Sequence, residues 1–372
     1  MDRIRTAKHA TQPVTPKSPM NTFLELLEEK RVLLTDGATG TNLFALGLQS
    51  GDSPEFWNTD YPDRVATHYR SFIEAGSDII LTNTFGGNSY RLKLHNGEDR
   101  VAEFNQAAVK ILAAEIKKSG RKIAIAGSIG PTGEILEPSG PTTISEAAES
   151  FAEQAMALKD GGADVLWIET ISSREEAIAS VRGAAVTGLP IVLTMSIDTN
   201  GRTMMGLTPA DLVALQDELE VPLTAYGTNC GLGAAEVIAA MVNMKIAADS
   251  SSLHPIFVAK GNCGIPEWVD GEIAYNGTPE LMSRYAGMAI DAGARIVGGC
   301  CGTSAEHVAA MRIAIDEHLS NKTMHTPPSA VEIEEALGDI TKGAKAQLAG
   351  DLTIEGGASA SANRRDRRSR RR

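Results

Sequence analysis

Two adjacent cysteines, Cys300 and Cys301, lie in the segment VGGCCGT, although the whole chain has only four cysteines. Cys230 also follows a short apolar run that is typical of a strand. Thiolates are ligands that Zn²⁺ prefers, and three protein ligands leave one tetrahedral position open for a reactant. The pattern therefore indicates a zinc site. The fourth cysteine, Cys263 in KGNCGIP, is expected to have a packing or rim role.

The adjacent pair imposes a condition on the backbone. Consecutive side chains of a regular strand point to opposite faces, so both thiols can reach one metal only where the chain bends sharply. Gly298, Gly299 and Gly302 supply the freedom to bend. Two other interpretations stay open at this point: a pair of small buried hydrophobic side chains, or a redox-active pair.

Two acidic residues follow strand-like runs and are candidates for chemistry. Asp36 ends the first run and Glu169 ends the fourth. Such acids can act as general bases, as metal ligands or as binders of a cationic group, and the alternative is a salt bridge to a nearby basic residue. Glu169 has the same strand parity as Val165 and Trp167, so a regular strand places all three on its inner face.

The segment DGATGT, residues 36–41, leads into a helix-like stretch. Free amides at a helix start attract anions, and without the lysine of a P-loop a carboxylate fits better than a phosphate. The alternative is a tight turn. The seven histidines are scattered and none ends a strand, which argues against a histidine base and favours a metal-activated nucleophile.

The elements that position these residues repeat regularly. A short apolar run is followed by a helical pattern eight times, which predicts a parallel sheet closed into a (β/α)8 TIM barrel. A doubly wound sheet is the competitor, but DGATGT is not its usual glycine turn. The eight runs are residues 31–37, 77–85, 122–130, 163–170, 190–197, 222–230, 255–263 and 294–302.

The ends of the 372-residue chain differ from its middle. We expect a flexible tail over residues 1–20, the barrel over 21–319, and a C-terminal linker, short helix and basic tail over 320–372. Ile333, Leu337 and Ile340 share one helical face, which we expect to pack on the barrel or on a second subunit of a homo-oligomer. Beyond about residue 342 the composition indicates disorder.

The composition indicates which partners and which cellular location to expect. The net charge is −12, and the tail RRDRRSRRR carries +6, so the remainder carries −18 and should repel nucleic acid. No apolar run reaches the roughly 18 residues of a membrane span, and the basic start has no apolar stretch typical of a secretory signal. We therefore expect a cytoplasmic protein with reduced thiols and no membrane or nucleic-acid partner.

Five motifs occur in a distinctive order: DGATGT, GSDIILTNTF, GSIGPTGE, TNCGLG and GGCCGT. In order and spacing they resemble the zinc-dependent homocysteine S-methyltransferases, over roughly residues 30–319. The resemblance implies a TIM barrel that binds Zn²⁺ and homocysteine and forms methionine. It also implies site roles: zinc binding by Cys230, Cys300 and Cys301, amino-group binding by Asp36 and Glu169, and carboxylate contacts from the Gly37–Ala38 backbone and Thr82.

The sequence indicates the methyl donor less clearly than the acceptor. As a short chain it resembles bacterial betaine–homocysteine S-methyltransferases, which implies glycine betaine or a related onium compound. Animal betaine enzymes carry tyrosines where this chain has Gly86 and Thr170. The aromatic residues that could rebuild a cation–π cage are Trp57, Tyr90, Trp268 and Tyr275, for each of which ordinary packing is the alternative.

Two other functions stay open. Two of the motifs also resemble the homocysteine module of cobalamin-dependent methionine synthase, so the chain could be the homocysteine-activating subunit of a split enzyme. A zinc-binding barrel that acts as a scaffold without turnover is the third interpretation.

Overall fold

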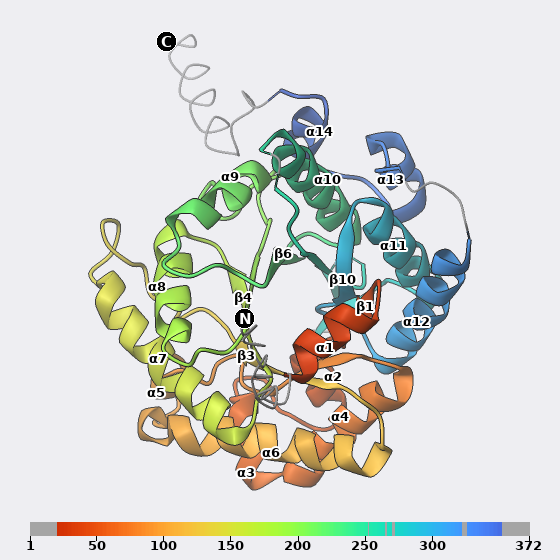
Figure 1. Ribbon diagram of the computed structural model, residues 1–372. Coiled ribbons are helices and arrows are strands. Elements are labelled where there is room, and N and C mark those ends of the chain that lie inside the picture. Colours follow the sequence, from red (N-terminus) through yellow and green to blue (C-terminus); the bar gives the residue numbers. More distant parts are fainter. Residues whose placement is uncertain (1–20, 252, 265, 270–271, 322–325, 352–372) are drawn as a thin grey trace, which may run out of the picture.

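Eight parallel strands surround a central axis in the computed structural model, which describes residues 21–351 except 252, 265, 270–271 and 322–325. The strand order is β1-β10-β7-β6-β5-β4-β3-β2, which confirms the predicted TIM barrel (Figure 1). The strands are β1 (Leu33–Leu34), β2 (Ile79–Leu81), β3 (Ala124–Ile129), β4 (Val165–Ile171), β5 (Ile191–Met195), β6 (Ala225–Cys230), β7 (Phe257–Gly261) and β10 (Ala294–Gly299).

Helices form a ring outside the strands (Figure 1). The ring consists of α4 (Pro62–Ala75), α6 (Val101–Ser119), α7 (Ile144–Gly161), α8 (Arg174–Ala185), α9 (Pro209–Ala214), α10 (Ala234–Ser250), α11 (Pro279–Asp291) and α12 (Ala305–Ser320). Shorter elements lie in the loops: α2 (Gly40–Ala45), α3 (Trp57–Asp60), α5 (Ser89–Lys93), three 3₁₀ turns (Pro54–Phe56, Glu98–Arg100, Leu215–Glu218) and a hairpin of β8 (Pro266–Val269) and β9 (Glu272–Tyr275).

The helix α1 (Thr22–Glu29) covers one end of the barrel (Figure 1). Its buried residues Phe23, Leu26 and Leu27 join the cluster of inward-facing strand side chains that includes Val165 and Trp167. Burial of each such side chain contributes roughly 1.5–3 kcal/mol. Because α1 packs against the amino ends of the strands, the carboxyl end of the barrel is the one left for a site.

The gap between β1 and β2 is bridged largely by two aspartates, and we call this gap the seam. The backbone amide of Asp78 donates to the Leu34 carbonyl at 2.7 Å, and the Leu34 amide donates to the Asp78 carboxylate at 3.0 Å. At the carboxyl end the Leu81 amide donates to Asp36 Oδ2 at 2.7 Å. Side-chain oxygens thus take the place of ladder carbonyls along the seam.

The C-terminal region packs on the same chain. The helix α13 (Ala330–Leu337) contacts α10 and α11 and buries Ile333, as predicted, whereas Leu337 is only partly buried. Ile340 is buried but lies beyond the helix, which Gly338 ends, so it does not share the predicted helical face. The structure differs from the expected disorder at α14 (Lys342–Leu348), which packs on α10 because Thr341 caps it and also donates to Glu236. The predicted flexible segment 1–20 and basic tail 364–372 lie outside the described residues.

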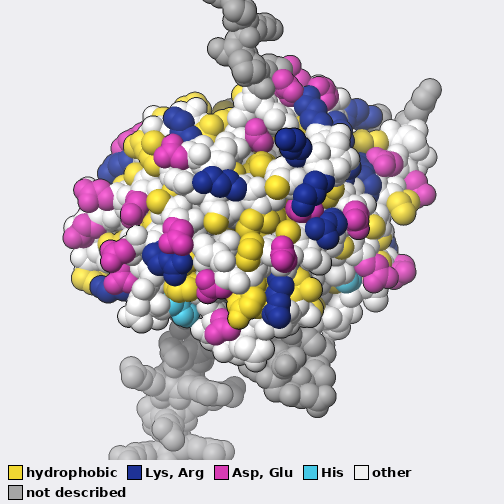
Figure 2. Space-filling model, turned by 90° about the horizontal axis from the view of Figure 1, so that it is seen from below, with side chains coloured by type: hydrophobic (Ala, Val, Ile, Leu, Met, Phe, Trp, Pro, Cys, Tyr) yellow, Lys and Arg dark blue, Asp and Glu magenta, His cyan; other side chains and the backbone are white. Residues whose placement is uncertain are grey.

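The surface carries charges of both signs. On the face shown in Figure 2, acidic and basic side chains alternate among apolar patches instead of gathering into areas of one sign. Among the described residues, no helix combines the length and the apolar character needed to cross a bilayer.

The seam yields a stability prediction. Asp78 is buried and also pairs with Lys30 at 2.5 Å and Arg312 at 3.2 Å. We expect Asp78→Ala to lower the free energy of unfolding by about 2–3 kcal/mol, because the Leu34 amide loses a charged acceptor. Urea unfolding followed by circular dichroism measures the change.

The matched control is Asp316→Ala, which removes an exposed partner of the same Arg312. An exposed pair of this kind contributes at most about 1 kcal/mol. Equal losses in the two variants would contradict a role for Asp78 in closing the seam.

Candidate active site

Three thiols meet at the carboxyl end of the barrel. The sulfurs of Cys230, Cys300 and Cys301, which we call the sulfur cluster, lie within 4.8 Å of one another, and Cys230 and Cys301 are 3.8 Å apart. A tetrahedral ion with metal–sulfur bonds of about 2.3 Å requires sulfurs about 3.8 Å apart. Hydrogen bonding among the three thiols lowers the pKa of Cys301 and raises the pKa of Cys230, and the pKa of Cys300 is also raised. The cluster therefore fits a thiolate-bound metal ion.

The backbone bend predicted for the cysteine pair is present. The strand β10 ends at Gly299, after which the Cys300 amide donates to the Gly261 carbonyl of β7 at 2.8 Å. Gly302 then adopts φ +77°, a left-handed conformation that favours glycine. Gly298 has another role: a Cβ there would lie 1.8 Å from Thr35 Oγ1, so its small size permits close contact with the strand-1 segment.

Two asparagines hold the cysteine segments in place. Asn229 Nδ2 lies 3.8 Å from the Cys300 sulfur and donates to Thr170 Oγ1 at 2.8 Å. Asn262 Oδ1 accepts a hydrogen bond from the Cys301 amide at 3.0 Å. Both asparagines end strands in the sequence, but only the structure shows that they orient metal-ligand candidates, a role that typically affects metal affinity.

Cys263 lies outside the sulfur cluster. Its side chain is buried among apolar residues, and burial raises its pKa to about 11. Its backbone amide donates to the Cys301 carbonyl at 2.9 Å. The packing role expected from the sequence agrees with this position.

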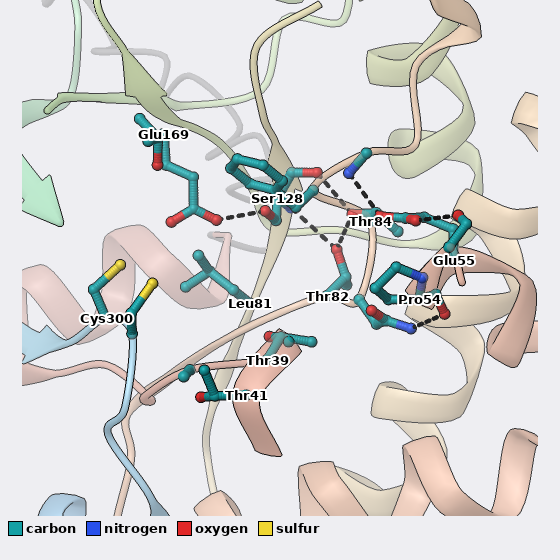
Figure 3. Close-up of a pocket in the computed structure, with 18 of the residues that line it drawn as sticks. Thr39, Thr41, Pro54, Glu55, Leu81, Thr82, Thr84, Ser128, Glu169 and Cys300 are labelled. Atoms are coloured by element: carbon teal, nitrogen blue, oxygen red, sulfur yellow. Dashed lines mark hydrogen bonds between the residues drawn. The ribbon is translucent and has the colours of Figure 1, made fainter. Parts of the chain in front are cut away.

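A lysine, Lys260, lies between the two acids Glu169 and Asp36. Glu169 Oε1 accepts from Ser128 Oγ at 2.6 Å, and Figure 3 shows Glu169 and Cys300 pointing into the same cavity. Lys260 Nζ lies 3.6 Å from Glu169 Oε2 and 3.6 Å from Asp36 Oδ1. Val165 and Trp167 face the barrel interior below Glu169, in agreement with the predicted parity.

Lys260 was missed from the sequence. A lysine inside the apolar run IFVAKG is the signal that could have found it, because a lysine is almost never fully buried unless it is paired. Burial raises the pKa of Asp36 to about 7 although Lys260 opposes this, and burial also raises the pKa of Glu169. Burial lowers the pKa of Lys260, but the charges of Glu169 and Asp36 outweigh it and raise that pKa.

Two of the groups predicted to contact the substrate carboxylate already donate hydrogen bonds within the chain. The Ala38 amide donates to the Thr303 carbonyl at 3.0 Å, whereas the Gly37 amide has no acceptor in the described part of the chain. Thr84 donates to the Ser128 carbonyl, so the 2.6 Å contact between the two threonine hydroxyls uses the proton of Thr82 (Figure 3). The Gly37 amide is therefore the free donor of this group.

A cavity of about 430 Å³ joins these groups. Its inner end is formed by the sulfur cluster, with Glu169 and Lys260 on its wall, whereas Asp36 is not among the lining residues. Its outer part is lined by Phe44, Phe85 and Arg91, which we call the outer wall. Phe44 is 50% exposed and Phe85 is 38% exposed, so both rings are accessible.

Three of the four aromatic residues proposed for a cation–π cage have described side chains, and none of these three lines the cavity. Trp57 is buried and stacks with Arg64, whose Cζ is 5.0 Å from the ring centroid. Tyr90 does not line the cavity. Tyr275 lies against Gly302 beside the sulfur cluster. The side chain of Trp268 lies outside the described part of the structure.

Comparison with known proteins agrees with this geometry. The family model described as homocysteine S-methyltransferase matches residues 33–315. The methionine synthases of Mycobacterium tuberculosis and Mycobacterium leprae are each 30% identical to this chain, over 309 and 310 residues respectively. These alignments cover 79% of this chain and 25% of each synthase, so the chain spans about a quarter of the length of these relatives.

Solved structures share the fold. The homocysteine methyltransferase MmuM of Escherichia coli superposes with TM-scores of 0.66 for its oxidized form and 0.65 for its metallated form. Each is 21% identical, and each match covers 79% of this chain and 99% of the other.

The sulfur cluster makes a prediction about metal content. We expect Cys230→Ala, Cys300→Ala and Cys301→Ala each to weaken metal binding by more than the ~10–100-fold typical of losing an orienting partner. Mass spectrometry of metal content after dialysis against a chelator series measures this. Cys263→Ala is the control and should keep the wild-type content, since its thiol is outside the cluster. A wild-type content in any cluster variant would exclude that cysteine as a ligand.

Proposed function

The chain belongs to the homocysteine S-methyltransferase family, and from this premise we propose that it transfers a methyl group from glycine betaine or a related onium compound to homocysteine, forming methionine. The observation that carries the proposal is the sulfur cluster at one end of a cavity whose wall carries the Glu169 carboxylate. The thiols must stay reduced, so we place the reaction in the cytoplasm.

We propose Zn²⁺ as the metal, held by Cys230, Cys300 and Cys301. A three-thiolate zinc site supplies an open fourth position at which a substrate thiol loses its proton near neutral pH. Three soft sulfur donors at tetrahedral spacing favour this ion. A free homocysteine thiol should titrate near the ~8.5 of cysteine. Because a bound metal ion would lower this pKa, no side chain has to act as a base.

The protein's own residues then bind and orient the acceptor. We propose that Glu169 binds the α-ammonium group from the cavity wall, and that Asp36 belongs to the same amino-group site through Lys260, which lies beside both acids. We propose that the Gly37 amide, a free donor on the cavity wall, binds the α-carboxylate, and that Thr82 supports that side of the cavity. Fixing the thiol in line with a donor methyl group is a proximity effect that can contribute several kcal/mol to lowering the barrier.

The outer wall supports an onium donor. The accessible rings of Phe44 and Phe85 can attract a cation through their faces, and Arg91 can pair with a donor carboxylate. Glycine betaine carries both groups. These residues take the place of the cage expected from Trp57, Tyr90, Trp268 and Tyr275.

A second candidate is favoured by the mycobacterial relatives. Both are methionine synthases, so the chain could accept a methyl group from a separate corrinoid protein. A scaffold role without turnover is the third candidate. Association into a homo-oligomer also stays a prediction, although the apolar face of α13 is already buried on α10 and α11.

One assay separates these functions. Zinc-loaded protein is incubated with homocysteine and glycine betaine without cobalamin, and methionine is measured by mass spectrometry. We expect methionine to form, and chelation of the metal to abolish it. Methionine formed only with a methyl-corrinoid protein would support the split enzyme, and bound zinc with neither activity would support the scaffold.

The role of Glu169 has its own test. We expect Glu169→Gln to raise the KM for homocysteine by ~10–100-fold, since a charged hydrogen bond contributes about 1.5–3 kcal/mol. Asp198→Asn is the control, because Asp198 also lies beyond a strand end but accepts from Ser196 and does not line the cavity. An unchanged KM in Glu169→Gln would exclude Glu169 from amino-group binding.

A further inference from the structure

Lys260 occupies the centre of the site without an assigned role. It lies in β7, and its side chain is 2% exposed. Its Nζ lies 5.4 Å from the centroid of the Trp167 ring, which belongs to the apolar cluster in the barrel interior. The ammonium group is therefore supported from the barrel interior while Lys260 lines the cavity.

The charges around Lys260 do not balance. Two carboxylates, Asp36 and Glu169, share one ammonium group. Lys260 lies equally close to both acids, but only Glu169 lines the cavity, whereas Asp36 is fully buried away from it. Of the two carboxylates, Glu169 is therefore the one that a ligand can reach.

The distances leave room for a ligand. Lys260 Nζ lies 3.6 Å from each carboxylate, beyond the roughly 2.7–2.9 Å of a charge-assisted hydrogen bond. Asp36 Oδ1 is buried and has no hydrogen-bond partner among the described residues. The three groups thus form a loosely held charge triad and not a closed salt bridge, so the carboxylate on the cavity wall can still accept a hydrogen bond.

We propose that Lys260 is a positioning residue for the acceptor amino acid: it cancels the charge of Asp36 and leaves Glu169 with the single negative charge that binds one α-ammonium group. The triad thereby selects a thiol that carries an ammonium group over the same thiol without one. This inference rests on the proposed function, in which homocysteine is the acceptor.

The test compares homocysteine with 4-sulfanylbutanoate, which lacks only the amino group. Binding is measured by calorimetry on zinc-loaded protein without a methyl donor, and kcat and KM are measured with the donor. Lys260→Met leaves two uncompensated carboxylates, which repel 4-sulfanylbutanoate more than homocysteine, since only homocysteine carries a positive charge. We therefore expect the preference for homocysteine over 4-sulfanylbutanoate to rise at least ~10-fold in Lys260→Met, with the change in KM larger than the change in kcat. Lys260→Arg keeps the positive charge and should leave the preference near the wild-type value.

A double variant gives the sharper outcome. Asp36→Asn keeps the shape of the side chain, and Asp36→Asn combined with Lys260→Met again leaves Glu169 with one negative charge. We expect the double variant to return the preference to near the wild-type value. A preference that stays raised in the double variant would overturn the triad, because Asp36 would then carry no charge for Lys260 to cancel.

Controls separate the remaining outcomes. Lys159→Met removes an exposed lysine that donates to the Thr187 carbonyl and does not line the cavity, and it should leave both ligands unaffected. If Lys260→Met does not fold, Lys260→Gln takes its place. Wild-type protein that binds homocysteine with a preference unchanged in Lys260→Met or Lys260→Gln would overturn this inference alone, whereas wild-type protein that does not bind homocysteine would overturn the proposed function.

Discussion

The site depends on bringing together sulfurs from strands that are not neighbours. Cys230 ends β6 and the adjacent pair follows β10, and β7 lies between these strands. Strands two apart are separated by about 9.5 Å, yet the Cys230 and Cys301 sulfurs are 3.8 Å apart. Both segments must therefore leave their strands and turn over the end of β7. Cys230 does so with φ +62° and the loop after β10 with Gly302 at φ +77°. A positive φ is ordinary for glycine but uncommon for any other residue, so Cys230 is the strained position of the two.

The end of β7 serves both halves of the site. Its Gly261 carbonyl accepts from the Cys300 amide, and the next residue, Asn262, accepts from the Cys301 amide. One position earlier, Lys260 points inward between the two acids. The carboxylate Asp36 is likewise shared, because one oxygen holds the seam at Leu81 while the other faces Lys260. Substitutions at this acid therefore report on charge only when the side-chain shape is kept.

Much of this arrangement could be predicted from the sequence because it depends on local periodicity. The eight runs, the interior parity of Glu169 and the bend at Cys300 all follow from where side chains point along a strand. Other features could not be predicted because they depend on contacts between residues far apart in the chain. They are the hydrogen bonds that occupy the Thr82 hydroxyl and the Ala38 amide, and the position of Lys260. The helix α14 escaped prediction because its composition is poor in large apolar residues and its contacts with α10 decide its fold.

The cavity divides into two parts that rest on different elements. The inner part, with the sulfur cluster and the charge triad, is held by strand ends whose backbones are tied into the barrel. The outer part, with Phe44, Phe85 and Arg91, stands on α2, α5 and the loop after β2. Loops at the carboxyl end of a TIM barrel can change without disturbing the strands. In the function we propose, thiol activation therefore depends on the barrel itself, whereas the choice of methyl donor depends on a few loop residues, and two family members that share the first need not share the second.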